Sequence, residues 1–208
     1  MKQLVVLFSI LFSFSSIVAQ EYKSCENSAY CKKFIKDKQA STSTISADFT
    51  ESSYSSMLKE AQKSSGELWF KQPGKIRFEH VSPKKTVLLI NNQSIKYFDN
   101  GKEIKNVAAL KVIRKIQDLM VKMFSGAFFE SKEFTLSYYE NATNYKINLT
   151  PKNKRMTKYI SVIQLVFSKK DGTLKELTIK ENETDKLVYT FSNIQLNKTI
   201  LDTKFSTL

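Results

Sequence analysis

Few side chains in this sequence have types and spacing suited to catalysis. His80 is the single histidine among 208 residues, and no nucleophile or metal ligand stands at a motif spacing from it. Because it lies on the apolar side of an alternating segment, we expect a packed or hydrogen-bonded histidine rather than a general base. The glutamates at Glu133, Glu140, Glu176 and Glu181 show no sign of an acid–base pair. We therefore expect a protein that is not an enzyme; a hydrolase that uses His80 is an alternative.

Cofactor and metal sites are not expected either. Five glycines form neither a dinucleotide-binding fingerprint nor a phosphate-binding loop, and one histidine excludes histidine-rich metal sites. Cys25 and Cys31 are the only cysteines. Their spacing is not that of a C-x-x-C redox pair, and the polar residues 22–24 before Cys25 disfavour a lipidation site. We expect a local disulfide between the two cysteines after export.

The first nineteen residues have the pattern of a secretory signal peptide. Lys2 supplies the positive start, residues 4–18 supply the apolar core, and Ala19 is a small residue at the cleavage position. No later apolar run approaches the length of a membrane span. The sequence predicts a signal peptide over residues 1–19 and a single exported domain over residues 20–208.

The chain is basic, with a formal net charge of +13 and a pI near 9.6. Its lysines are dispersed, and residues 152–158 (KNKRMTK) form the densest cluster. Three interpretations fit this charge: a nucleic-acid site, a face that meets anionic lipid or acidic partners, and a lysine-rich solvated surface. An exported protein rarely meets nucleic acid, so we expect no such partner; the solvated surface is the simplest interpretation.

The elements that position these residues are mostly strands. Apolar and polar residues alternate over 45–49, 66–71 and 75–81, and Ile76, Phe78 and His80 share one side of the last segment. Further strands are predicted over residues 86–90, 94–98, 103–107, 134–139, 145–150, 160–167, 174–180, 187–191 and 194–196. Glycine-containing turns separate many of them, so the sequence predicts consecutive hairpins in one antiparallel sheet.

Two segments break the strand pattern. Residues 27–38 are predicted to form a short helix with Tyr30, Phe34 and Ile35 on one face. Residues 108–129 carry the strongest helical periodicity, with a wide apolar stripe opposite a lysine-rich face. A large twisted sheet tends to curl, and a helix with one broad apolar stripe is suited to cover the concave side.

Large apolar side chains accumulate on one side of the strands and on the longer helix. They are Leu68, Phe70, Ile76, Phe78, Ile95, Tyr97, Met120, Met123 and Phe124. Methionines adapt to irregular apolar partners, so these residues could line a cavity for flexible apolar ligands. From the pattern alone, an ordinary packed core explains them as well.

The order of several motifs resembles the periplasmic outer-membrane lipoprotein carrier family, the LolA-like proteins. The N-terminal half contains SADFTE at 46–51, GELWFKQPGKIRF at 66–78 and SIKYF at 94–98. The C-terminal half contains KDGTL at 170–174, YTF at 189–191 and the segment 197–205, which resemble the closing strands of that family. The resemblance extends over nearly the whole exported chain.

The resemblance implies a mainly β, α+β fold: a single curved antiparallel sheet that forms an incomplete β-barrel, covered by helices that enclose a hydrophobic cavity. It implies a carrier in the periplasm of a Gram-negative bacterium that shields the acyl chains of lipoproteins, or of a related lipid-linked product, between the inner and outer membranes. A release complex in the inner membrane and an outer-membrane acceptor are the implied partners of a monomer. An envelope-stress sensor or a protein-interaction module on the same half-barrel is the alternative function.

One position departs from the family pattern. Many members carry an arginine, tied to lid closure and directional transfer, where this sequence has Gln72. Arg77 is near in sequence but lies on the side of its strand opposite Ile76 and Phe78, so it is no obvious substitute. By position, Ile76 and Phe78 match family residues that line the cavity near the lid.

Overall fold

The structure is a computed structural model that describes residues 21–92, 94–105, 120–206 and 208. Its main feature is one antiparallel sheet of twelve strands in the order β1-β8-β9-β10-β11-β12-β2-β3-β4-β5-β6-β7. The strands are β1 (Lys23–Ser24), β2 (Thr44–Tyr54), β3 (Gln62–Lys71), β4 (Lys75–Ser82), β5 (Thr86–Asn91), β6 (Ser94–Asp99), β7 (Lys102–Glu103), β8 (Phe134–Glu140), β9 (Asn144–Pro151), β10 (Val162–Ser168), β11 (Leu174–Lys180) and β12 (Lys186–Leu196).

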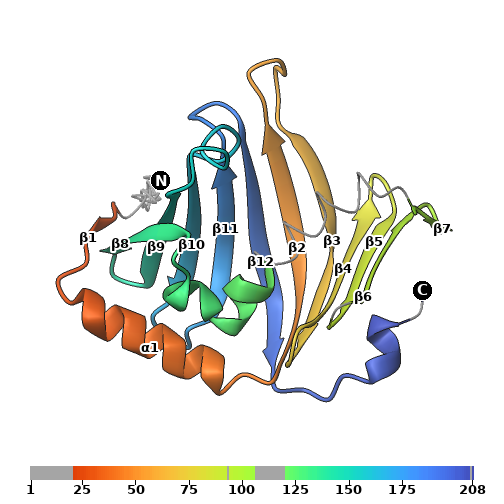
Figure 1. Ribbon diagram of the computed structural model, residues 1–208, viewed down its shortest axis with the longest axis horizontal. Coiled ribbons are helices and arrows are strands. Elements are labelled where there is room, and N and C mark those ends of the chain that lie inside the picture. The colour runs from red at the N-terminus through yellow and green to blue at the C-terminus, as the bar shows by residue number, and fades with distance from the viewer. Residues whose placement is uncertain (1–20, 93, 106–119, 207) are drawn as a thin grey trace, which may run out of the picture.

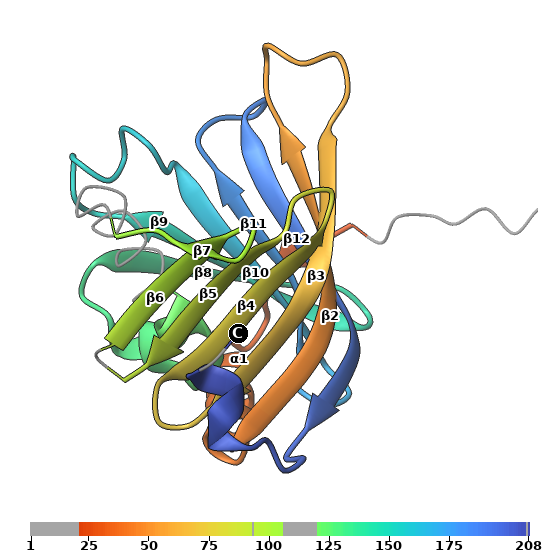
Figure 2. The same cartoon turned by 90° about the vertical axis from the view of Figure 1, so that its right-hand side faces the viewer.

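The sheet curls without closing into a barrel, with β1 and β7 at its two edges (Figure 1). Helix α1 (Ser28–Ala40), the helical residues 120–125 and the short 3-10 helix η1 (Ala127–Glu130) lie on its inner, concave side. A second 3-10 helix, η2 (Asp202–Phe205), packs on the outer side over β4 and β5, as the turned view makes plain (Figure 2). The predicted class, a mainly β incomplete barrel with helices over one face, is confirmed.

The burial of each strand follows from what covers its two faces. In β4, Ile76 and Phe78 face inward and are buried. Strand β5 is buried on both faces because its outward residues Val87 and Leu89 lie under the C-terminal segment, where Phe205 of η2 is buried too. This double cover explains why residues 87–90 form a continuous apolar run instead of an alternating one.

The hairpin of β2 and β3 is longer than the alternating pattern predicted. Residues 50–54 and 62–65 extend both strands, and the register pairs Ser53 with Gln62. These residues are mostly Ser, Thr and Gln, so they carry no apolar alternation that would mark them as strand. Figure 1 shows the hairpin rising above the neighbouring strands. The two segments predicted at 187–191 and 194–196 are one strand, β12, with a register shift between Ser192 and Gln195.

The first helix begins and ends close to the prediction, but its buried face differs. Asn27 caps the N-terminus, since its side-chain oxygen accepts a hydrogen bond from the Tyr30 backbone. Cys31, Ile35 and Gln39 form the buried face, whereas Tyr30 is 56% exposed. The predicted common face of Tyr30, Phe34 and Ile35 therefore overlaps this buried stripe only at Ile35, and the rings of Tyr30 and Phe34 stack 6.4 Å apart beside it.

Several predictions fall partly or wholly on residues outside those described. The signal peptide over 1–19 is one of them, and the helix over 108–129 is described from residue 120 onward. Within the described part of the chain, no helix has both the length and the hydropathy needed to cross a membrane.

Candidate functional site

The apolar residues predicted from the strand pattern meet on the inner face of the sheet. Leu68 and Phe70 of β3 and Ile76 and Phe78 of β4 are buried in one cluster with Met120, Met123 and Phe124. Ile95 and Tyr97 of β6 are half-buried against the edge of that cluster. The structure thus brings all nine predicted residues together, in packed contact.

A short helical stretch covers this surface. We call residues 120–130 the cover segment. The ring of Phe124 packs 5.8 Å from Phe70 and 6.1 Å from Phe191, measured between ring centroids. Farther along, Phe128 lies 6.3 Å from Phe167 of β10. Aromatic side chains therefore join the cover segment to the sheet at both β3 and β10, beside the buried Met120 and Met123.

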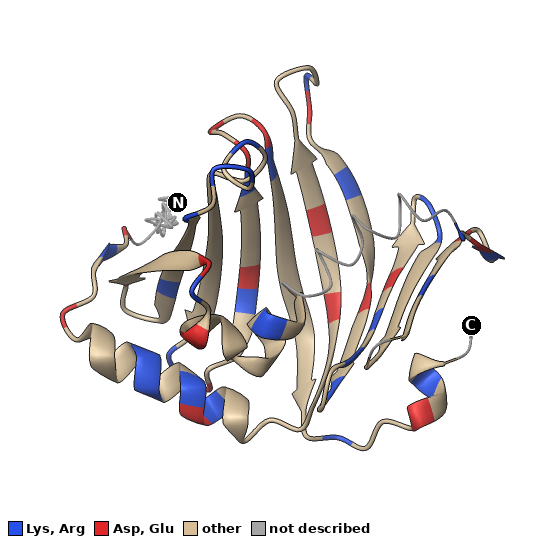
Figure 3. Cartoon of the chain, in the orientation of Figure 1, with Lys and Arg blue, Asp and Glu red and all other residues tan. Residues whose placement is uncertain are grey.

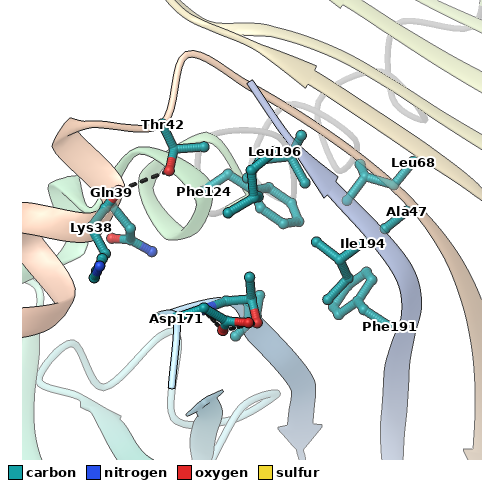
Figure 4. A pocket seen from close by; sticks show the side chains of 14 residues that line it. Lys38, Gln39, Thr42, Ala47, Leu68, Phe124, Asp171, Phe191, Ile194 and Leu196 are labelled. Carbon is teal, nitrogen blue, oxygen red and sulfur yellow. Dashed lines mark hydrogen bonds between the residues drawn. The ribbon is translucent and has the colours of Figure 1, made fainter. Parts of the chain in front are cut away.

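A cavity of about 30 Å³ lies between the cover segment, α1 and the sheet. Figure 4 shows the residues around it, among them Ala47, Leu68, Phe124, Phe191 and Leu196. A space of this size can hold water but not an acyl chain. An acyl chain that binds at this part of the inner face therefore needs the cover segment to move.

Sequence reasoning named two of these lining residues, Leu68 and Phe124, and missed the others. The missed inward residues of β2 and β12 include Ile45, Ala47, Phe191, Ile194 and Leu196. Their alternation was visible at 45–49 and 187–196, and the register Ala47↔Leu68 places β2 directly beside β3. The strand order could not be read from the sequence, because β12 pairs with β2 although the two strands lie far apart in the chain.

Polar contacts also fasten the cover segment. The side-chain amide of Gln39, on α1, donates a hydrogen bond of 3.0 Å to the carbonyl oxygen of Met123. Lys36 of α1 forms an ion pair of 2.8 Å with Glu130 at the end of the cover segment. Gly126 has a φ of +76°, and a Cβ at this position would clash with Gln39 Oε1. Glycine is thus required where the cover segment passes α1.

Gln72, at the position where the family pattern has arginine, contacts the end of α1. Its side-chain amide donates to the carbonyl oxygens of Thr42 at 2.8 Å and Gln39 at 3.4 Å. The turn between β3 and β4 is thereby joined to α1, and α1 to the cover segment. Arg77 lies on the outer face, as predicted. It is buried beside Trp69 and pairs with Glu79 at 2.8 Å.

His80 belongs to a hydrogen-bonded group farther along the inner face. Its Nε2 lies 3.0 Å from Glu51 Oε2, its Nδ1 lies 3.1 Å from Thr86 Oγ1, and its ring packs on Phe49 and Phe78. Burial would raise the pKa of Glu51, but hydrogen bonds from His80 and Tyr189 lower it below its ordinary value. Burial and the neighbouring Glu51 raise the pKa of Tyr189. The expectation of a packed, hydrogen-bonded histidine is confirmed.

Cys25 and Cys31 are both free cysteines in the structure, so the predicted disulfide is not formed there. The two thiols are close enough to hydrogen bond to each other. Burial raises the pKa of Cys31 to about 12, and Cys25 adds to the effect. A thiol with so high a pKa is a poor nucleophile at neutral pH. Among the described residues, no three His, Cys, Asp or Glu side chains form a metal-binding group.

An open antiparallel sheet whose apolar inner face lies under a helical cover defines a half-barrel binding protein. The chain belongs to the LolA family: the family model described as "Outer membrane lipoprotein carrier protein LolA" matches residues 40–207. The family name describes a carrier rather than a catalyst.

Relatives named outer-membrane lipoprotein carrier protein are similar along most of the chain. The protein of Coxiella burnetii strain CbuK_Q154 is 26% identical over 207 residues, which cover 98% of this chain and 92% of the relative. That of Pseudoalteromonas translucida is 22% identical over 198 residues, covering 95% and 88%.

Solved structures are more distant. A LolA superfamily protein from Nitrosomonas europaea aligns with a TM-score of 0.43 at 9% identity, over 85% of this chain and 97% of the other. MucB in complex with periplasmic MucA aligns with a TM-score of 0.41 at 8% identity, over 85% of this chain and 58% of the other.

Proposed function

We propose that this protein is a periplasmic carrier that shields the acyl chains of lipoproteins, or of a related lipid-linked product, during transfer from the inner to the outer membrane. The observation that carries the proposal is the apolar inner face under a cover segment that, within the described residues, is held by the buried Gln39 hydrogen bond and by peripheral ion pairs. Membership of a family named for lipoprotein carriage, and relatives with that name, support it.

The physical need for a carrier is clear from the cargo. Each methylene left in water costs about 0.8 kcal/mol, so acyl chains do not cross an aqueous compartment unaided. An inner face lined by Leu68, Phe70, Phe78 and Phe191 offers them an apolar surface. When the cover segment moves aside, acyl chains replace its contacts with Phe70 and Phe191, and little apolar surface meets water in the exchange.

Such an exchange favours both uptake and release. Because the empty form already buries its inner face, the free energy of acyl binding is the difference between two apolar packings rather than a full transfer from water. Binding is therefore moderate, which suits a protein that must pass its cargo on. Gln72 contributes by holding α1, and through it the cover segment, where the family pattern has arginine.

The remaining features of the proposal concern the protein's surroundings. We infer one domain over residues 20–208, exported by the signal peptide at 1–19 and acting as a monomer. An inner-membrane release complex donates the cargo, and an outer-membrane acceptor receives it. No step in this scheme needs a catalytic residue, metal or cofactor.

Depletion of the protein in its own cells tests this function. Membranes are separated by density, and acylated lipoproteins are quantified in each fraction by mass spectrometry. The proposal predicts that outer-membrane lipoproteins accumulate several-fold in the inner membrane before growth stops. An unchanged distribution of lipoproteins and other acylated products, with induced envelope-stress genes, would favour the sensor alternative.

A further inference from the structure

The connections at one end of the sheet form a surface that the carrier function does not explain. We call it the open rim; it comprises the turns at 55–61, 83–85, 152–161 and 181–185. The register places them together, since Tyr54 pairs with Lys186, Lys186 with Lys180, and Lys180 with Val162. Helix α1 meets the opposite end, where Gln72 follows β3. Figure 1 shows these rim turns above the sheet and α1 below it.

Large apolar side chains protrude from this rim. Met57, at the tip of the hairpin of β2 and β3, is 91% exposed, and Tyr159, in the turn between β9 and β10, is 72% exposed. Leu58 and Tyr54 beside Met57 are also exposed. Met57, Leu58 and Tyr54 cluster at the hairpin tip, and clustered exposed apolar groups mark an interaction site where single ones do not.

The tip that carries Met57 is held in place by its neighbours. The backbone of Ser56 donates a 2.6 Å hydrogen bond to Asp185, and Leu58 donates one of 3.0 Å to the carbonyl oxygen of Ser55. Lys186 stacks its ammonium 5.0 Å from the centre of the Tyr54 ring. Met57 and Leu58 are thus exposed to water on a turn that is fixed by hydrogen bonds.

The basic cluster at 152–158 lies on the same rim. Lys152, Lys154, Arg155 and Lys158 are all exposed, while Met156 and Ile160 anchor the turn by packing against the core. Lysines of α1, by contrast, are paired with acidic groups, as with Lys33 and Asp37. Within the described part of the chain no ion pair engages the four cations of this turn.

Asp185, Glu183 and the neighbouring Asp99 are engaged by other groups, whereas Glu60 and Glu181 of the rim form no ion pair among the described residues. Asp185 accepts the hydrogen bonds of the hairpin tip, Glu183 pairs with Lys180 at 3.2 Å, and Asp99 pairs with Lys84 at 2.6 Å. Figure 3 marks the positions of basic and acidic residues along these upper turns in blue and red. The basic turn and the apolar tip are separated by four strand spacings, β9 to β2, or about 20 Å.

We infer that the open rim docks on the surface of an anionic phospholipid bilayer. The cations at 152–158 attract the head groups, and Met57, Leu58 and Tyr159 enter the interface between head groups and acyl chains. Three apolar side chains and a basic patch give reversible attachment rather than anchoring. This inference goes beyond the carrier function, because docking needs no cargo.

Vesicle sedimentation with the cargo-free exported protein tests the inference. Vesicles of phosphatidylglycerol and phosphatidylethanolamine are compared with vesicles of phosphatidylcholine at low and high salt. The bound fraction should be several-fold larger on the anionic vesicles and should fall with salt. Lys154→Gln with Arg155→Gln and Lys158→Gln should weaken binding at least about tenfold, and Met57→Ser with Leu58→Ser should weaken it on both vesicle types.

The matched control removes three exposed charges from the opposite end, away from the cover segment: Lys33→Gln, Lys170→Gln and Lys198→Gln. Its binding should stay within about twofold of the unmodified protein. An equal loss of vesicle binding in the control variant would overturn the inference, and so would equal binding to anionic and phosphatidylcholine vesicles. If the protein shows no preference for anionic vesicles but binds an acidic protein, the rim instead fits a protein partner. Uptake of a fluorescent fatty acid is measured on the same variants without vesicles. A variant that takes up the fatty acid but does not bind vesicles has lost docking and not the carrier function.

Discussion

Gln39 and Met123 join the two helical elements that cover the inner face. The Gln39 side-chain amide donates to the Met123 carbonyl oxygen at 3.0 Å, and the other amide atom, Oε1, is buried with no hydrogen-bond partner among the described residues. Met123 is near the end of a helix, where carbonyl groups lack partners within the helix. The contact therefore satisfies one buried carbonyl oxygen while leaving a polar oxygen unsatisfied, which makes it a weak fastening.

Replacement of Gln39 by Leu should loosen the cover segment at little cost in stability. The variant loses one hydrogen bond, worth about 1 kcal/mol, but also removes the unsatisfied oxygen. We expect a fluorescent fatty acid to enter several-fold faster in stopped-flow measurements, with a free energy of unfolding within about 1 kcal/mol of the original. An unchanged entry rate would mean that this contact does not limit opening.

Gly126→Ala should destabilise the protein more than Gly101→Ala. Both glycines have a positive φ, +76° and +80°, so alanine costs roughly 1 kcal/mol of backbone strain at each. At Gly101 the new Cβ meets nothing within 4 Å, whereas at Gly126 it clashes with Gln39 Oε1. Because Oε1 ends a flexible side chain that can turn away only by giving up its hydrogen bond to Met123, we expect a loss about 1 kcal/mol larger at Gly126 in urea unfolding. Equal losses would contradict the close approach of the cover segment to α1.

Ala47→Leu should block acyl binding, because residue 47 lines the cavity on the inner face of β2. A leucine there fills the cavity and overpacks its wall, at about 1–3 kcal/mol. The neighbouring Ser46→Leu points to the other face of the same strand and serves as the control. We expect fatty-acid affinity to fall at least about tenfold for the first variant alone, with circular dichroism showing that both are folded. Equal fatty-acid affinities of the two variants would show that the acyl chain binds at another site.

The exported protein should contain a disulfide between Cys25 and Cys31. The two thiols lie close enough to shift each other's pKa, and a dithiol of this kind is oxidised by thiol–disulfide exchange after export. Protein recovered from the periplasm and alkylated without reductant should show no labelled cysteine by mass spectrometry, and two after reduction. Labelling of both cysteines before reduction would exclude the disulfide.

Glu51 should make stability depend on pH in the acid range. Its pKa is lower in the folded protein than the ordinary value of 4.5, so its contribution is present above pH 4.5 and disappears as the pH falls through the folded pKa. Glu51→Gln should therefore be less stable than the original near pH 6, and the gap should narrow toward pH 3. The exposed Glu60→Gln is the control. A gap that is constant over this range would contradict the assignment.

The sequence predicts most of the sheet because alternation reports which face of a strand is buried. It predicts Ile76, Phe78 and His80 on one face and Arg77 on the other, and the structure agrees. Residues 50–54 and 62–65 escaped prediction because their hydrogen bonds, not apolar burial, make them strand. Pairings between residues far apart in the sequence, such as Phe49 with Phe191, leave no local signal. The cavity residues on β2 and β12 could therefore be identified only from the fold.

The polar contacts that hold the cover segment could likewise not be predicted from the sequence. Gln39 is one polar residue in a lysine-rich helix, and only the packing of α1 against residues 123–126 gives it a partner. The resemblance drew attention to Gln72 as a departure from the family pattern. Its contact with Thr42 and Gln39 shows how a glutamine joins the same turn to α1.

Native mass spectrometry of the exported protein mixed with a synthetic triacylated lipopeptide tests the central proposal most directly. The carrier account predicts a soluble complex of one lipopeptide with one protein chain, lost in Ala47→Leu and retained in Ser46→Leu. A protein that stays free of lipopeptide at every ratio, while the lipopeptide remains in micelles, would contradict it.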